Sequence, residues 1–406
     1  MAKYVFFNFP ASGHVNPTLA IVEELIKRGE QVVYYLPERF RQTIEATGAT
    51  FHAYQDTLFT HEHKQAGSPV NPAHGDQRLA MLPTMMIQES LQVVPQLLES
   101  VRADQADCLI YDSMFLWGRM MAQILHIPAI ALRPSYAANE QSNVFRNYAQ
   151  HFPPSPERTI VLNNVLAQLS ATYGVPSFDM RSVLRHTEPL KIVFLPRAFQ
   201  PGGEMFDESY LFVGPSFQPN RDKDLAFPFE QLGTQPLLYI SLGTVFNHQA
   251  DFYRSCLTAF GETEWQVVLS VGPDVDRTTF PPIPGNFFVA PRVPQLEVLA
   301  RANLFISHGG MNSTMESLSY GVPLVVIPQI SEQAATARRV QELGLGIALD
   351  REMVTAERLR EAVAQVAHDP SYRTNAHNMQ NTIIDSGGYQ RATDAVMQFA
   401  RTHVQA

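Results

Sequence analysis

Two histidines that directly follow apolar runs are the residues of this sequence best suited to chemistry. His14 lies in ASGHVNP, after the apolar residues 4–9, and His308 lies in FISHGGMNST. An imidazole has an unperturbed pKa of about 6.5, so His14 can accept a proton from a hydroxyl group near neutral pH if a neighbour fixes its tautomer. We therefore consider His14 a candidate general base.

Asp112 is the carboxylate that such a base would need. It ends the apolar run CLIYD, and the carboxyl ends of parallel strands meet at one edge of a sheet. A carboxylate at that edge can bond the second ring nitrogen of His14 and stabilise the imidazolium. The alternative is that His14 and Asp112 each only cap the helix that follows, and their spacing leaves both interpretations open.

The run Phe305–Gln333, FISHGGMNSTMESLSYGVPLVVIPQISEQ, is the strongest signal for a ligand. It predicts a strand, a glycine turn, a helix and a second strand. The glycines after His308 allow close approach of the backbone, and the helix that begins near Asn312 points its N–H groups and its positive dipole end at that turn. Such a turn binds phosphate without a metal ion, so we predict a nucleotide or nucleotide-sugar ligand.

Other polar residues of the same half could contact that ligand. Glu316 follows Ser313 by three residues, which is the spacing of a helix capping box, and its carboxylate is also suited to the hydroxyl groups of a ribose. Both roles can coexist. A second strand-to-helix turn in YISLGTVF offers Ser241, Gly243 and Thr244 to phosphate or nucleoside, although SLGT by itself is a short motif.

Glu332 and Gln333 follow the apolar run Leu324–Ile327 and its exit at Pro328. A carboxylate and an amide side by side suit the hydroxyl groups of a sugar. The alternative is that both belong to the first turn of a helix Gln333–Leu343, where an acidic residue is expected in any case.

These residues require a scaffold of alternating strands and helices, and the sequence predicts one in each half of the chain. Short apolar runs alternate with helical patterns from the N-terminus, and the alternation begins again at Leu237. The pattern predicts two doubly wound, Rossmann-like parallel-sheet domains of the α/β class, with a ligand between them at the carboxyl ends of the strands. The strands and helices expected are residues 4–9, 31–36, 39–47, 79–101, 108–112, 115–125, 129–132, 237–241, 252–260, 266–271 and 287–289.

The domain boundary is predicted in the segment 213–236, which is rich in proline, glycine and charge. We therefore expect an N-terminal domain over residues 1–215, a linker over 216–236 and a C-terminal domain over 237–385. Residues 386–406 predict a final helix.

Composition excludes several classes of protein. The 406 residues carry a net charge of −9 and no basic cluster, which argues against a nucleic-acid partner. The two cysteines, Cys108 and Cys256, lie far apart in apolar surroundings, so buried free thiols are expected. No apolar stretch is long enough for a signal peptide or a membrane span, so we expect a cytoplasmic protein. As a separate expectation, the protein is a monomer or a weak dimer.

A metal site is not expected. The pairs Asp222 and Asp224, and Asp274 and Asp276, imitate a metal-binding DxD motif, but they lie in charged or proline-flanked segments typical of solvated loops. The cluster at residues 61–63 lacks the helical spacing that would bring two histidines to one zinc ion. There is no GxGxxG after the first strand and no GxSxG elbow, which disfavours dehydrogenases and α/β-hydrolases.

Taken together, GHVNP, YDSMFLWG, SLGTVF, VPQLEVL and SHGGMNSTMESLSYGVPLVVIPQISEQ resemble the family-1 UDP-glycosyltransferases, most closely the bacterial macrolide and flavonoid subfamily. The resemblance covers nearly the whole chain. It implies the GT-B fold, in which two Rossmann-like domains face each other across a cleft. The N-terminal domain would bind the acceptor and the C-terminal domain the donor, and the last helix would cross back to the N-terminal domain.

The resemblance also implies a role for each matching residue. His14 would be the base and Asp112 its partner in one inverting transfer from a UDP-sugar to a lipophilic hydroxyl acceptor, without metal or other cofactor. The donor would be bound by residues of the C-terminal half, namely Ser241, Gly243, Thr244, Val293, Gln295, His308, Gly310, Asn312, Ser313, Glu316, Glu332 and Gln333. Val293 replaces the tryptophan that stacks on uracil in plant members, which leaves the choice between uridine and thymidine open.

The acceptor is less well indicated. Apolar and aromatic residues of the N-terminal half suit an adaptable pocket for flat or lipophilic molecules, and the same residues could equally be packing in the core. The candidates are Phe59, Met85, Met114, Phe115 and Tyr136. Two other functions stay open, namely a UDP-sugar epimerase of related fold and a non-catalytic subunit that binds a nucleotide sugar.

Overall fold

A computed structural model describes residues 1–56, 72–139, 156–176, 188–218, 221–222, 225–245, 247–273 and 275–404. The chain forms two compact units. The first contains the beginning of the chain, Leu79–Gln218 and Ser386–Ala406, and the second consists mainly of Pro219–Asp385. The first unit therefore includes both ends of the chain.

The described residues of the first unit form a seven-stranded parallel sheet in the order β3-β2-β1-β4-β5-β6-β7. The strands are short apolar runs buried on both faces, as parallel sheets require. The order reverses between β1 and β4, which makes that pair the topological switch point. The strands are β1 (Lys3–Phe7), β2 (Gln31–Leu36), β3 (Thr50–Ala53), β4 (Cys108–Asp112), β5 (Ala129–Arg133), β6 (Leu190–Val193) and β7 (Tyr210–Phe212).

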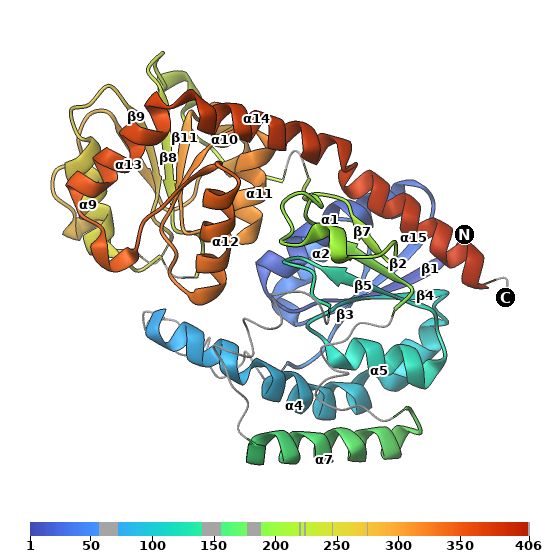
Figure 1. The fold of residues 1–406 in the computed structure, drawn as a ribbon. Helices are drawn as coiled ribbons and strands as arrows, with labels where there is room; N and C mark the ends of the chain where they lie inside the picture. Colours follow the sequence, from blue (N-terminus) through green and yellow to red (C-terminus); the bar gives the residue numbers. More distant parts are fainter. Residues whose placement is uncertain are drawn as a thin grey trace. The chain divides into compact units, whose positions relative to one another are not determined.

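Helices cover both faces of this sheet (Figure 1). Apolar residues of α1 and α15 pack on one face, and those of α4, α5 and α7 pack on the other. Each face thus buries its own apolar core. The helices are α1 (Ser12–Lys27), α2 (Arg41–Glu45), α4 (Pro72–Asp104), α5 (Leu116–Leu125), α7 (Pro156–Tyr173) and α15 (Gly388–Val404).

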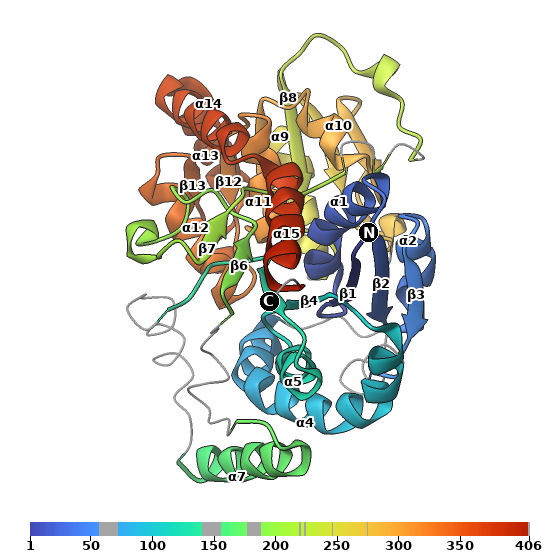
Figure 2. The same ribbon diagram turned by 90° about the vertical axis from the view of Figure 1, so that its right-hand side faces the viewer.

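The final helix, α15, packs along α1 although the second unit separates them in the sequence (Figure 2). Its buried face includes Val396 and Phe399, which join the core of the first unit. The Gly388 N–H donates to the Val213 carbonyl at 2.7 Å, and Arg28 of the first unit pairs with Asp394. The last residues of the chain therefore complete the first core.

The described residues of the second unit form a six-stranded parallel sheet in the order β10-β9-β8-β11-β12-β13. Its order reverses between β8 and β11, and Ser241 and Ser307 end these two strands side by side. This unit therefore has its own switch point. The strands are β8 (Leu237–Ser241), β9 (Gln266–Ser270), β10 (Phe287–Ala290), β11 (Leu304–Ser307), β12 (Leu324–Val326) and β13 (Gly346–Ala348).

Helices α9 and α13 cover one face of the second sheet and bury apolar side chains against it (Figure 1). The helix that follows β11, α11, begins at the carboxyl end of that strand and packs against α14. The α-helices of this unit are α9 (Ala250–Phe260), α10 (Gln295–Leu299), α11 (Met311–Ser319), α12 (Ser331–Glu342), α13 (Ala356–His368) and α14 (Pro370–Asp385).

This architecture is the GT-B fold of two Rossmann-like domains. The strands Gln31–Leu36, Cys108–Asp112 and Leu237–Ser241 have the predicted bounds. Both cysteines are buried and free. Within the described ranges, no helix is long and apolar enough to cross a membrane.

Candidate functional site

His14 and Asp112 meet at the switch point of the first sheet. His14 lies in the first turn of α1, the helix that follows β1, and Asp112 ends the neighbouring strand β4. The imidazole Nδ1 lies 2.6 Å from Asp112 Oδ2. The carboxylate can only accept this hydrogen bond, so Nδ1 carries the proton and Nε2 carries the lone pair that a general base needs.

Neighbouring groups hold both members of this pair. The Met114 N–H donates to Asp112 Oδ1 at 2.8 Å, and the buried Asn8 amide donates to the His14 carbonyl at 3.0 Å. The Asp112 side chain is 1% exposed and that of His14 is 25% exposed. The arrangement is therefore a fixed carboxylate behind an imidazole that solvent or a ligand can reach.

The alternative role of these two residues as helix caps is wrong. α1 begins at Ser12 with Ala11 at the N-cap, so His14 lies inside the helix. The N-cap of α5 is Phe115, and neither helix has a side-chain cap. The Asp112 carboxylate instead bonds the imidazole and its own turn.

An aromatic series extends from His14. The Phe9 ring lies 4.8 Å from the imidazole and 5.6 Å from the Phe115 ring, centroid to centroid, and Phe115 lies 5.0 Å from Trp117. Phe9 is half-buried and was not among the sequence candidates. Phe9 lies after the end of β1 and is followed by proline and alanine, so the sequence gives it no periodic signal.

The remaining acceptor candidates differ in burial. Phe115 is buried in the core, Met85 and Met114 are half-buried, and Tyr136 is buried and stacks on Phe199. Phe59 lies outside the described residues.

In the second unit, His308 is held between two glycines at the β8–β11 switch point. A Cβ added to Gly310 would lie 2.4 Å from His308 Nε2, and one added to Gly243 would lie 2.6 Å from His308 Cε1. Gly243 also has a φ of +76°, which L-residues rarely adopt. Only glycine leaves the imidazole enough space on both sides.

Burial makes His308 a neutral imidazole. Desolvation lowers the pKa of His308 from its ordinary 6.5 to about 4, and a hydrogen bond with the Ser241 backbone opposes this shift only in part. Among the described residues, none hydrogen-bonds its buried Nδ1. A bound ligand or water would satisfy that atom.

The shifted pKa of His308 predicts a loss of stability in mild acid. The unfolded chain binds a proton on His308 below about pH 6.5 and the folded chain only below about pH 4, so stability falls as the pH falls through this window. We expect this residue to contribute about 2 kcal/mol of the loss in the free energy of unfolding between pH 7 and pH 5. Urea unfolding at both pH values should show a smaller loss for His308→Asn, and equal losses would contradict the buried neutral state.

The helix α11 opens at the glycine turn without a side-chain cap. Gly310 is its N-cap and no side chain caps its first turn, so the capping box predicted for Ser313 and Glu316 is wrong. Gly309, with a φ of +82°, turns the backbone just before it. Asn312 and Ser313 lie in the first turn, where backbone N–H groups and the helix dipole favour an anion.

We expect Gly310→Ala to weaken binding of UDP by roughly tenfold or more, because the new Cβ displaces the His308 ring at a typical overpacking cost. Gly310 has an ordinary φ of −61°, so the effect would be steric. Isothermal titration with UDP measures it. The control is Gly285→Ala in the same unit, whose Cβ meets nothing within 4 Å. Equal UDP affinity in the two variants would show that the position of His308 between Gly243 and Gly310 does not affect nucleotide binding.

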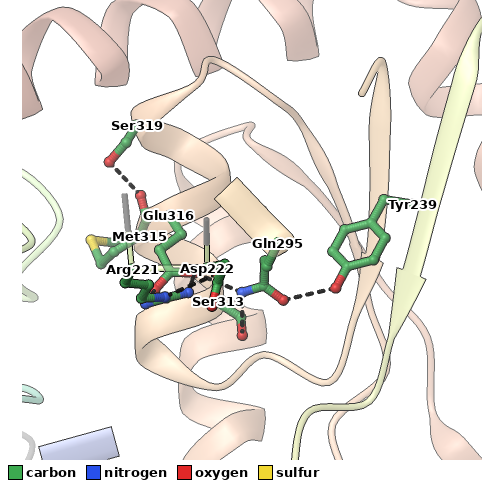
Figure 3. A network of polar contacts seen from close by, with 8 residues as sticks. All are labelled: Arg221, Asp222, Tyr239, Gln295, Ser313, Met315, Glu316 and Ser319. Atoms are coloured by element: carbon green, nitrogen blue, oxygen red, sulfur yellow. Dashed lines mark hydrogen bonds and ion pairs between the residues drawn. The ribbon is translucent and has the colours of Figure 1, made fainter. Parts of the chain in front are cut away.

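Glu316 forms the centre of a polar network (Figure 3). Its Oε1 accepts from Arg221 at 2.6 Å, and its Oε2 accepts from Arg221 at 2.9 Å and from the Gln295 amide at 2.6 Å. Gln295 in turn accepts from the Tyr239 hydroxyl at 2.9 Å. The contact of Gln295 with Ser313 is longer, at 3.5 Å. Arg221 and Gln295 thus bond the carboxylate directly, and Tyr239 and Ser313 contact Gln295 behind it.

Arg221 was not predicted from the sequence. It lies in the segment expected to be an exposed linker, and its only sequence signal is charge. Asp222, expected to be a solvated loop charge, lies with Oδ2 3.3 Å from Arg221 Nε and is only partly exposed.

The other donor candidates lie at strand ends of the second unit. Ser241 is buried and its Oγ accepts from the Gly243 N–H at 3.2 Å, whereas Thr244 is exposed. Val293 is buried just before α10.

Glu332 and Gln333 lie in the first turn of α12, which begins at Ser331. Glu332 is exposed, and Gln333 accepts from the Gln329 N–H at 2.8 Å. The expected helix is therefore present, two residues earlier than predicted.

Within the described ranges, no three His, Cys, Asp or Glu side chains form a group that could hold a metal ion. Asp276 caps a short 3₁₀ turn, Arg277–Thr279, by accepting from the Thr278 N–H at 2.9 Å. Asp224, Asp274 and the cluster at 61–63 lie outside the described residues.

Comparisons with known proteins identify the relatives of this chain. A family model for the C-terminal domain of erythromycin biosynthesis protein CIII-like proteins matches residues 254–388. The chain is 41% identical to NDP-glycosyltransferase YjiC of Bacillus licheniformis over 97% of this chain and 96% of that protein. It is 31% identical to demethyllactenocin mycarosyltransferase of Streptomyces fradiae, covering 98% and 86% of the two chains. The crystal structure of CalG4, the calicheamicin glycosyltransferase, superposes with a TM-score of 0.85 and 31% identity over 98% of both chains.

Proposed function

This chain belongs to the bacterial macrolide-type family-1 glycosyltransferases, and on that basis we propose that it transfers glucose from UDP-glucose to a hydroxyl group of a lipophilic small molecule with inversion at the sugar. Family membership makes it an enzyme that transfers a sugar from a nucleotide sugar. The observation that carries the proposed mechanism is the 2.6 Å contact between His14 and Asp112 at a sheet switch point.

In the proposed reaction, His14 Nε2 takes the proton of the acceptor hydroxyl as its oxygen attacks the anomeric carbon. The bond from that carbon to the diphosphate breaks and UDP leaves, so an α-linked donor gives a β-glycoside. Asp112 stabilises the imidazolium formed in this step and returns the base to its starting tautomer when the proton is lost.

The second unit would hold the donor. The first turn of α11 and the neutral His308 would face the diphosphate, and Glu316 would accept from the ribose. Glu332 and Gln333 would contact the sugar from the first turn of α12. The support for these roles is that the first turn of α11 lacks a side-chain cap and that His308 Nδ1 lacks a partner among the described residues.

We propose that no metal is required, because a helix N-terminus can stabilise the leaving diphosphate. For the acceptor we propose a macrolide, flavonoid or other phenolic, since the half-buried ring of Phe9 offers an apolar surface beside His14. Activity in the cytoplasm and a monomeric or weakly dimeric state complete the proposal.

Incubation with UDP-glucose and a panel of phenolic and macrolide acceptors in the presence of EDTA tests this function. We expect a β-glucoside by mass spectrometry and NMR, at the same rate with and without EDTA. A dependence on added metal would refute the metal-free reaction. An epimerised or free sugar formed without any acceptor would instead identify the epimerase alternative, and the absence of any glycoside across the panel would count against the proposed acceptor class.

A further inference from the structure

The contacts of Glu316 leave it with a defined remaining capacity for hydrogen bonds. A carboxylate has about four lone-pair positions, two on each oxygen. Among the described residues, Oε2 accepts two hydrogen bonds and Oε1 accepts one. One position on Oε1 can therefore accept a further donor such as a hydroxyl group.

The burial of Glu316 requires a positive partner. Its side chain is 4% exposed, and a buried carboxylate is costly unless a cation and hydrogen bonds compensate for the lost hydration. Arg221 provides both through a two-pronged guanidinium contact, which fixes the plane of the carboxylate as well as its charge.

Arg221 is itself held in place. Its Nε faces Asp222 at 3.3 Å while its terminal nitrogens bond Glu316, so two carboxylates share one guanidinium. Burial opposes the charge of Arg221, but Glu316 and Asp222 together outweigh that effect and raise its pKa. A guanidinium anchored on both sides is suited to remain in place when a ligand arrives.

We propose that Arg221 is a positioning residue for the donor: its paired contact holds the Glu316 carboxylate in the orientation in which Oε1 accepts a hydrogen bond from a hydroxyl group of the nucleotide ribose. This inference rests on the proposed donor site. It assigns a function to a residue of the segment 213–236, where the sequence indicated only a linker. The opposite role is that Arg221 occupies the place of the ribose and must leave before a nucleotide binds.

The test is binding of UDP, measured by isothermal titration, to Arg221→Gln, Arg221→Lys and the wild type. We expect Arg221→Gln to weaken UDP binding by about tenfold or more, the usual effect of losing a charged hydrogen bond in a buried site. Arg221→Lys retains the charge without the paired geometry and should fall between them. The KM for the donor should rise in parallel while kcat stays close to that of the wild type. Arg254→Gln, which breaks an exposed ion pair with Asp251 in the same unit, should leave UDP binding unchanged.

Two further measurements separate positioning from a merely structural role. In a Glu316→Gln background, Arg221→Gln should cost little additional affinity, because the two residues act as one unit. Of 2′-deoxy-UDP and 3′-deoxy-UDP, the analogue that lacks the hydroxyl bound by Glu316 should lose most of its sensitivity to Arg221→Gln. Additive losses, or equal sensitivity of both analogues, would overturn the proposal.

Unchanged or tighter UDP binding by Arg221→Gln would also overturn the proposal. It would favour the opposite role, in which Arg221 occupies the place of the ribose and leaves when a nucleotide binds. If Arg221→Gln does not fold, the comparison of Arg221→Lys with the wild type decides the same question. UDP binding can be measured without sugar transfer. A wild type that binds UDP but transfers no sugar would count against the proposed function and leave the role of Arg221 in UDP binding to be decided by the variants.

Discussion

Replacing His14 by alanine is expected to lower kcat for glycoside formation by roughly 10²- to 10⁴-fold, the usual contribution of a positioned general base. The variant retains every residue proposed to hold the donor, so UDP affinity should stay within about twofold of the wild type. This separates chemistry from binding. Initial rates with UDP-glucose and a phenolic acceptor, together with isothermal titration of UDP, measure both effects.

A suitable control is His403→Ala, which removes an exposed histidine from the last turn of α15 in the same unit. Its rate should match the wild type. Acceptors with a lower hydroxyl pKa should suffer less from His14→Ala, because they need less help to lose the proton. Full activity of His14→Ala would rule out the base assigned to the 2.6 Å contact.

Asp112→Asn is expected to lower kcat by roughly 10²-fold or more while leaving the fold nearly intact, because the amide is isosteric but carries no charge. Without the carboxylate, the imidazolium formed during proton transfer loses its stabilising partner, and an amide N–H facing Nδ1 favours the wrong tautomer. The pH profile of kcat should shift its acid limb to lower pH. Rates measured from pH 5 to pH 9 test both expectations.

Asp107→Asn is the matched control for this change. Asp107 precedes β4 at the opposite edge of the sheet and accepts from the Lys3 N–H at 2.7 Å. It should alter stability slightly and the pH profile not at all. A loss of activity in Asp112→Asn that Asp107→Asn reproduces would point to damage to the sheet rather than to the chemistry.

Much of the scaffold was predictable because parallel strands buried on both faces appear as unbroken apolar runs. Cys108–Asp112 and Leu237–Ser241 are such runs, and their bounds agree with the prediction. The carboxyl ends of such strands, and the loops that leave them, share one edge of the sheet, which is why the sequence alone predicted that His14 and Asp112 are close. The strand Gly346–Ala348 was not predicted, since a run of three residues that begins with glycine gives too weak an apolar signal.

The site residues that the sequence missed are those whose position depends on tertiary contacts. Arg221 reaches Glu316 across 95 positions of sequence, and no local pattern connects them. The SxxE spacing of Ser313 and Glu316 suggested a local cap, but the helix begins two residues before Ser313 and the carboxylate binds the distant guanidinium. The SxxE motif therefore pointed to Glu316 as a polar contact residue but predicted the wrong partner for it.

The packing of α15 on α1 has a consequence for how the protein is made. Val396 and Phe399 cover apolar side chains of the first unit, yet they follow the second unit in the sequence, so a ribosome adds them after it. During synthesis the first unit must wait, with one apolar face uncovered, until the second unit has emerged. The apolar face of α1 is therefore where we expect chaperones to bind the nascent chain longest. A premature stop near residue 385 would leave the first unit incomplete, whereas the second unit would keep its own sheet and core.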